Sequence, residues 1–85
     1  MEIISEVPMY DENRGISYAW TDGFEIQTAI EDGVIYINAN KEGLLSMANH
    51  LLNLAQDKIP KYHHMHFDEF NSLEDGSIHM IINKV

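Results

Sequence analysis

The sequence predicts an α+β fold: a mostly antiparallel sheet of five or six strands with one long helix packed on one face. Three observations lead to this prediction. Segments with apolar side chains at alternate positions recur along the chain, as expected for half-buried strands. Turn residues such as Asp-Gly separate these segments, and one segment near the middle repeats apolar residues at helical spacing.

The N-terminal part of the chain is predicted to contain two strands, at residues 3–7 and 16–20. Pro8 ends the first strand, because proline cannot donate a hydrogen bond to a neighbouring strand. Residues 11–15 combine acidic residues, Asn and Gly, a composition typical of a turn or short loop.

A third strand, residues 24–31, is predicted to follow through a three-residue loop at residues 21–23, with Gly in the left-handed position. In this register Trp20 pairs with Phe24, and Trp20 and Tyr18 lie on the buried face. A two-residue Asp-Gly loop is the alternative. It would turn Trp20 and Tyr18 to the opposite, open face.

Asp32-Gly33 is the strongest hairpin signal in the chain, and it joins the third strand to a fourth at residues 34–39. A two-residue loop here pairs Ile30 with Ile35 on the face that points to the core. Tyr36 then lies on the opposite, open face of the hairpin.

The long helix is predicted over residues 41–57, with Asn40 as its N-cap. Pro60 prevents its continuation. The apolar stripe that should face the sheet contains Leu44, Leu45, Ala48, Leu51, Leu52 and Ala55. The polar side, expected to face solvent, contains Ser46, Asn49, His50 and Asn53.

Two further strands are predicted at residues 63–67 and 78–85, joined by a long acidic connection. Strand alternation places Met65 and Phe67 in the core and two histidines on the other face. Asp75-Gly76 within the connection is ordinary turn chemistry. Together the predicted elements form a single domain over residues 1–85, since a chain of this length can bury one modest core.

The charge of the chain limits its partners. It carries 14 acidic residues against five Lys and Arg, for a net charge of −9 at pH 7. This balance argues against nucleic acid and anionic membranes as ligands, because phosphate binding needs clustered basic residues. It favours a basic protein partner attracted at long range.

The absence of cysteine excludes disulfides, a thiol nucleophile and a cysteine zinc site. No apolar run is long enough to span a membrane. The first residues lack the basic and apolar regions of a signal peptide, so a cytoplasmic protein is expected.

Two kinds of chemistry at the acidic connection and its flanking strands are alternatives to a non-catalytic role. His64, His66 and His79 share the open face of the predicted strands and, with Asp68, could hold zinc, copper or nickel. General acid–base catalysis would need a pocket around the acids of the connection, with His66 as their partner. The carboxylates concerned are Asp68, Glu69, Glu74 and Asp75. The prediction is therefore no catalytic, metal-binding or cofactor-binding residue.

An interaction surface is the favoured interpretation of the open face. Its tyrosine and histidines, surrounded by acids, resemble the aromatic anchors and charged rim of a protein-binding patch. The residues predicted to contact a partner are His64, His66, Asp68, Glu74, Asp75 and Tyr36. The same face could instead support a homodimer, because domains this small are marginally stable alone.

A resemblance to a known family rests on three motifs. They are the helical run at residues 42–56, the sequence His64-x-His66-Phe67-Asp68, and Ser72-Leu73-Glu74-Asp75-Gly76-Ser77 followed by Ile81-Ile82. Over residues 34–85 the chain resembles immunity protein 32 of bacterial polymorphic-toxin systems. The resemblance implies a non-enzymatic cytoplasmic protein that binds a cognate toxin and blocks its active surface. The acidity of the chain suits a basic nuclease toxin. The alternatives are a self-associating structural or regulatory domain and a histidine-based metal-binding protein.

Overall fold

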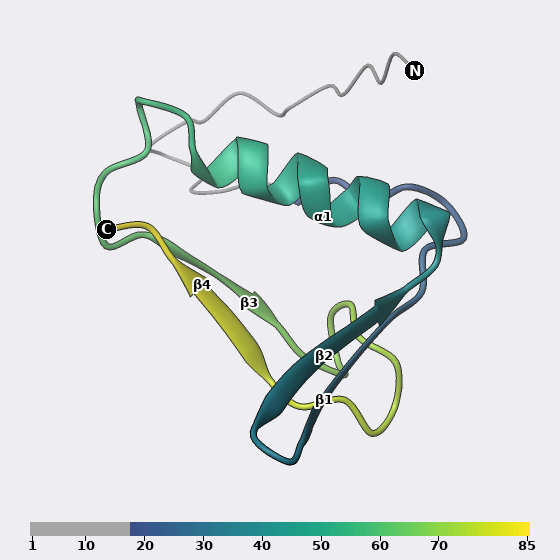
Figure 1. Cartoon of the computed structure of the whole chain (residues 1–85). Helices are drawn as coiled ribbons and strands as arrows, with labels where there is room; N and C mark the ends of the chain where they lie inside the picture. The colour runs from purple at the N-terminus through teal and green to yellow at the C-terminus, as the bar shows by residue number, and fades with distance from the viewer. Residues whose placement is uncertain (1–17) are drawn as a thin grey trace.

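In the computed structural model, residues 18–85 are described, and they form two antiparallel hairpins and one helix. The order along the chain is β1 (Ile26–Glu31), β2 (Val34–Ala39), α1 (Lys41–Leu54), β3 (His64–Phe67) and β4 (Met80–Asn83). The hairpins β1–β2 and β3–β4 both lie on the same side of α1 (Figure 1).

The predicted sheet of five or six strands is wrong, since the described residues contain two separate two-stranded sheets. The strand predicted at residues 3–7 lies outside the described residues, as do the first two positions of the strand at residues 16–20. Residues 18–20 form no strand. The α+β class and the presence of one helix remain correct within the described part of the chain.

The outer edge of β1 explains why its sheet does not grow on that side. The irregular segment at residues 74–78 occupies this edge, with Glu74 N donating to Ile26 O at 2.9 Å and Ile78 N donating to Thr28 O at 3.2 Å. Thr28 N donates to Ser77 Oγ at 3.1 Å. Loop backbone and a hydroxyl group therefore satisfy the groups that another strand would bind.

The register of the β1–β2 hairpin confirms the prediction. Ile30 pairs with Ile35 and Thr28 pairs with Ile37. The turn residues Asp32 and Gly33 have φ values of 52° and 76°. Two consecutive positive φ values are the mark of the type I′ turn, whose twist matches that of the strands.

The loop at residues 21–23 keeps the predicted turn without a strand on its N-terminal side. Gly23 has a φ of 81°, and Phe24 N donates to Thr21 O at 3.1 Å. The rings of Trp20 and Phe24 stack with centroids 4.5 Å apart. Trp20 packs against the core, so its side chain is on the side expected from the three-residue loop.

Helix α1 begins at the predicted cap. Asn40 Oδ1 accepts hydrogen bonds from Gly43 N at 2.8 Å and from Glu25 N at 3.0 Å, while its Nδ2 donates to Gly23 O at 2.9 Å. One side chain thus caps the helix and fastens it to the entry of β1. The helix ends at Leu54, one turn before the predicted end.

The face that α1 turns to the core is the reverse of the prediction. The buried residues of the helix are Gly43, Ser46, Asn49, His50, Asn53 and Leu54. Two polar side chains on this face have hydrogen-bond partners. Ser46 Oγ accepts from Thr21 N, in the loop before β1, at 2.8 Å, and Asn53 Oδ1 accepts from Gln56 Nε2 at 2.7 Å. At the start of this face, Gly43 allows the helix to lie close to the Glu25 carbonyl, where a larger side chain would clash.

The core lies between the helix and the two hairpins. Its buried apolar residues are Ile26, Leu54, Ile59, Met65, Phe67 and Leu73. Met65 and Phe67 confirm the predicted inward face of β3. At the far end of the helix, Lys84 Nζ donates to the carbonyl oxygens of Gln56 and Ile59, at 2.7 and 2.9 Å. This contact joins the end of β4 to the segment after α1.

Candidate functional site

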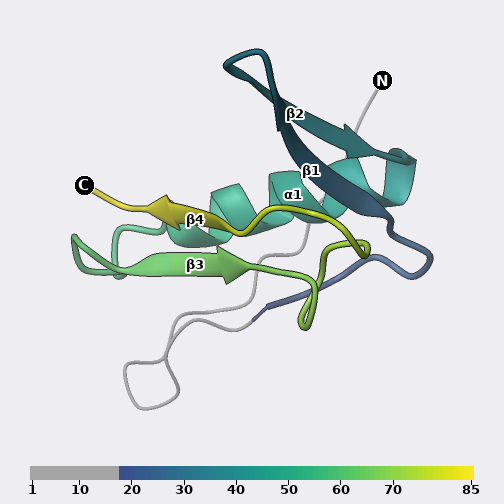
Figure 2. The same ribbon diagram turned by 90° about the horizontal axis from the view of Figure 1, so that it is seen from below.

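The β1–β2 hairpin projects from the rest of the molecule, with its turn at the periphery in both views (Figures 1 and 2). Ile26 and Thr28, near its base, are buried in the core. Beyond them both faces are open, and large apolar side chains are exposed on each. They are Ile30, Ile35 and Ile37 on one face and Val34 and Tyr36 on the other.

Strand β2 has an unpaired edge. Among the described residues its sole strand neighbour is β1. The ladder alternates, so residues such as Ile35 and Ile37 direct their backbone N–H and C=O groups away from β1. The six residues of β2 include no charge, proline or glycine. Proteins usually protect such an edge, because it can pair with another strand.

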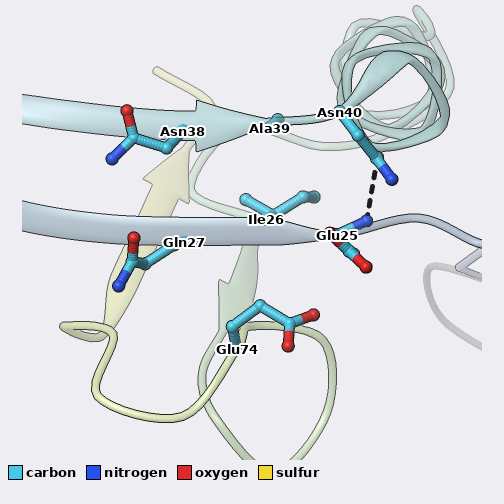
Figure 3. Close-up of a pocket in the computed structure, with 7 residues that line it drawn as sticks. All are labelled: Glu25, Ile26, Gln27, Asn38, Ala39, Asn40 and Glu74. Carbon is cyan, nitrogen blue, oxygen red and sulfur yellow. Dashed lines mark hydrogen bonds between the residues drawn. The ribbon is translucent and has the colours of Figure 1, made fainter.

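An acidic depression lies at the base of this hairpin, with a volume of about 470 Å³. It is lined by Glu25, Ile26, Gln27, Asn38, Ala39, Asn40 and Glu74. Figure 3 shows Glu25 on the entry to β1 and Glu74 on the neighbouring loop, both lining the acidic depression. Two carboxylates beside three side-chain amides form a site suited to a lysine or arginine side chain.

The backbone fixes both walls of the acidic depression. Glu25 N donates to the Asn40 side chain (Figure 3), and Asn40 N donates to Glu25 O at 3.2 Å. On the opposite wall, Glu74 N donates to Ile26 O. Asn38 and Tyr36 are two positions apart in β2, so their side chains lie on the same face of the strand. The exposed side chain of Tyr36 is therefore the next one along this face of β2 from the acidic depression.

The predicted partner-binding residues fall into two groups in the structure. Tyr36 and Glu74 belong to the β1–β2 hairpin and its acidic depression. His64 and His66 lie on β3, exposed, with their Nε2 atoms 2.8 Å apart. In this contact one imidazole donates a hydrogen bond to the other, so the two histidines bind each other.

Asp68 and Asp75 have local roles in the acidic connection. Asp68 Oδ1 accepts from Phe70 N at 2.8 Å and from Asn71 N at 3.0 Å, which closes a turn. Asp75 is exposed and precedes Gly76, whose φ is 86°. The hydrogen bonds of Asp68 hold this turn, and partner binding by Asp68 and Asp75 stays a prediction.

The three-histidine metal site is not formed in the part of the chain that the structure describes. No group of three or more His, Cys, Asp or Glu residues is placed there to hold a metal ion. No helix among residues 18–85 is long and apolar enough to cross a membrane.

Two residues were missed by sequence reasoning. Glu25 lines the acidic depression, and its signal was its place on the same strand face as Gln27. His50 was assigned to the solvent side of the helix, yet it is buried against the rings of Tyr18, Trp20 and Phe67. Burial lowers the pKa of His50 below its ordinary value of 6.5.

Comparison with known protein families identifies a match over most of the described residues. The protein-family model described as Immunity protein 32 matches residues 34–85, which is more than half of the chain. The match covers β2, α1, β3 and β4, and it includes Tyr36 and Glu74. No curated protein and no solved structure matches the chain significantly.

Proposed function

Because the chain belongs to the Immunity protein 32 family, we propose that it neutralises a cognate toxin by binding it directly through the β1–β2 hairpin. The bound chain would cover the active surface of the toxin and would contribute no catalysis of its own. The partner is thus a protein, and the cytoplasm is the expected place of the encounter.

The single observation that carries this proposal is the unpaired edge of β2, flanked by exposed apolar side chains on both faces. An extended segment of the toxin would add a strand to this edge, with backbone hydrogen bonds supplying affinity. Val34 and Tyr36 on one side, and Ile35 and Ile37 on the other, would hold alternate side chains of that segment.

The acidic depression supports a basic partner. A lysine or arginine of the toxin would enter between Glu25 and Glu74 and form charge-assisted hydrogen bonds there. The net charge of −9 favours the same class of partner. A nuclease is the toxin type that this charge suits best, because nucleases carry basic surfaces to bind phosphate.

The test of this proposal is binding to the toxin encoded beside the gene for this protein. Tyr36→Ala should weaken binding by about tenfold or more, as expected for a central aromatic anchor. Tyr62→Ala is the matched control, because Tyr62 is also an exposed tyrosine but lies outside the hairpin. Titration calorimetry measures both constants, and equal losses for the two variants would contradict the proposal.

A second pair of variants separates local charge from net charge. Glu74→Gln and Asp57→Asn each remove one negative charge, but Glu74 alone lines the acidic depression. Glu74→Gln should weaken toxin binding several-fold, whereas Asp57→Asn should leave it nearly unchanged. In a host exposed to the toxin, Glu74→Gln should protect less well than the wild type, whereas Asp57→Asn should protect about as well as the wild type.

A further inference from the structure

Two histidine side chains meet on the exposed face of β3. His64 and His66 are two positions apart in the strand, so their side chains lie on the same face. Both residues are exposed, and their Nε2 atoms are 2.8 Å apart. Met65 and Phe67, which alternate with them, are buried in the core and fix the outward direction of the histidines. We call His64 and His66 the histidine pair.

The two rings of the histidine pair meet at an angle rather than in line. A hydrogen bond of this length along the axes of both rings would separate the ring centroids by about 5.1 Å, whereas the observed separation is 4.6 Å. A metal ion about 2.0 Å from each Nε2 atom, with an angle of about 90° between the two bonds, would hold the nitrogens about 2.8 Å and the centroids about 4.5 Å apart. Both observed distances agree with this second arrangement.

We propose that His64 and His66 bind one divalent transition-metal ion, each through its Nε2 atom, and that the site favours Cu²⁺ and Ni²⁺ over Zn²⁺. A right angle between two ligands is the geometry of square-planar and tetragonal sites, which Cu²⁺ and Ni²⁺ prefer. Tetrahedral Zn²⁺ would need the two nitrogens to be about 3.3 Å apart. The ion replaces the hydrogen bond between the rings. The ring that donated this bond carries its proton on Nδ1 instead, so both Nε2 atoms present lone pairs.

Side chains from outside the β3–β4 hairpin hold the backbone of His66. His66 N donates to Tyr18 Oη at 3.0 Å, and His66 O accepts from Asn71 Nδ2 at 2.9 Å. His64 is held by its pairing with Asn83 of β4. The two ligands are therefore positioned before an ion arrives, so its binding costs little conformational entropy.

The histidine pair supplies two ligands, and solvent would supply the others. Among the described residues, no third His, Cys, Asp or Glu joins the pair in a metal-binding group. A depression of about 330 Å³ borders the pair and leaves room for water; it is lined by Tyr18, Tyr62, His63 and His64. Two imidazoles with open coordination positions predict reversible binding, unlike the closed four-ligand site of a structural metal.

Titration calorimetry of the full chain with Ni²⁺, on protein prepared without a histidine tag, tests the proposal. His64→Ala and His66→Ala should each raise the dissociation constant at least about tenfold, because a single imidazole cannot chelate the ion. The double variant should bind about as weakly as either single variant, since the first change already removes the chelate.

His79→Ala is the matched control. His79 is also an exposed histidine, but the structure does not bring it into a metal-binding group with the pair. Its removal should leave the dissociation constant unchanged. Far-ultraviolet circular dichroism checks that each variant keeps its fold.

Electron paramagnetic resonance with one equivalent of Cu²⁺ tests the geometry. The wild type should give the axial spectrum of a tetragonal ion, with coupling to two imidazole nitrogens. Each single variant of the histidine pair should lose the coupling to one of them. In competition titrations Zn²⁺ should bind more weakly than Ni²⁺, as expected for a right-angled pair of ligands.

Four results would overturn the proposal. They are an absence of saturable heat with Ni²⁺, equal losses in His79→Ala and in the variants of the pair, additive losses in the double variant, and tighter binding of Zn²⁺ than of Ni²⁺. Additive losses would mean two separate sites, and a preference for Zn²⁺ would mean a wider angle at the ion. None of these measurements needs the toxin, so their outcome is independent of the proposed function.

Discussion

His50 is an ionisable residue that is buried among aromatic rings. His50 is 1% exposed, and the centroid of its ring lies 4.1 Å from that of the Trp20 ring. Among the described residues, neither ring nitrogen has a hydrogen-bond partner. Tyr18 is the one titratable residue among the rings it contacts. Such a site accepts the neutral imidazole and disfavours the charged one.

The stability of the protein should therefore fall in mild acid. The unfolded chain takes up a proton at His50 as the pH drops below about 6.5, while burial lowers the pKa of the folded group. As far as His50 is concerned, the free energy of unfolding should therefore be highest above about pH 6.5 and should decrease as the pH falls below this value. Urea unfolding at a series of pH values measures this dependence.

His50→Leu should remove that part of the acid sensitivity, because the variant has no proton to bind at this position. His79→Leu is the control, since His79 is exposed and its removal should leave the dependence in place. The explanation fails if the difference in unfolding free energy between wild type and His50→Leu is the same at pH 5.5 and pH 7.5.

At the scale of elements, turns and caps were predictable, whereas the orientation of the helix was not. Asp32-Gly33 and Asn40 act through neighbours in the sequence, so local chemistry determines their conformations. The inward face of α1 depends on what approaches it. Gly43 lies so close to β1 that an added Cβ would clash with Glu25 O. Apolar periodicity contains no information about such a contact.

Gly43→Ala tests which face of the helix is buried. With Gly43 against β1, the added methyl group displaces the Glu25 carbonyl and should cost about 1–3 kcal/mol of unfolding free energy. If the exposed side of the helix with Leu44 and Leu51 faced the core instead, Gly43 would be exposed, and alanine would stabilise the helix by up to about 1 kcal/mol. The sign of the change decides between the two orientations.

Ala48→Gly calibrates this measurement. Ala48 is exposed in the middle of α1, so its replacement changes helix propensity with little change in packing. A loss of about 1 kcal/mol is expected in thermal or urea unfolding. Without a clash, Gly43→Ala should stabilise the protein by about the amount that Ala48→Gly destabilises it. The difference between that expected gain and the measured change is the cost of the clash.

The candidate site was predictable in part for similar reasons. Tyr36 was placed on an open face because strand alternation and the Asp32-Gly33 turn fix the register. The placement of Glu74 and Glu25 around one depression was not predictable, because it depends on the loop at residues 74–78 binding to the edge of β1. Contacts between segments about fifty residues apart leave no local pattern.

At the scale of the whole molecule, the net charge of −9 should control how fast a partner arrives. Long-range attraction accelerates association with a basic protein and is screened by salt. The association rate constant for the toxin should fall about tenfold or more between 50 and 500 mM salt, with a smaller change in the dissociation rate. Stopped-flow fluorescence, using Trp20 as the reporter, measures both rates. A salt-independent association rate would exclude electrostatic steering.

The position of β1 affects where this protein can be divided. The family match starts at Val34, inside a hairpin whose first strand lies entirely before it. That strand supplies Ile26, which is fully buried, and it connects β2 to the loop at residues 74–78. A truncated protein that begins at Val34 would retain the matched segment but lose β1, the strand between β2 and the loop at residues 74–78. The smallest autonomous folding unit therefore extends upstream of the region by which relatives are recognised.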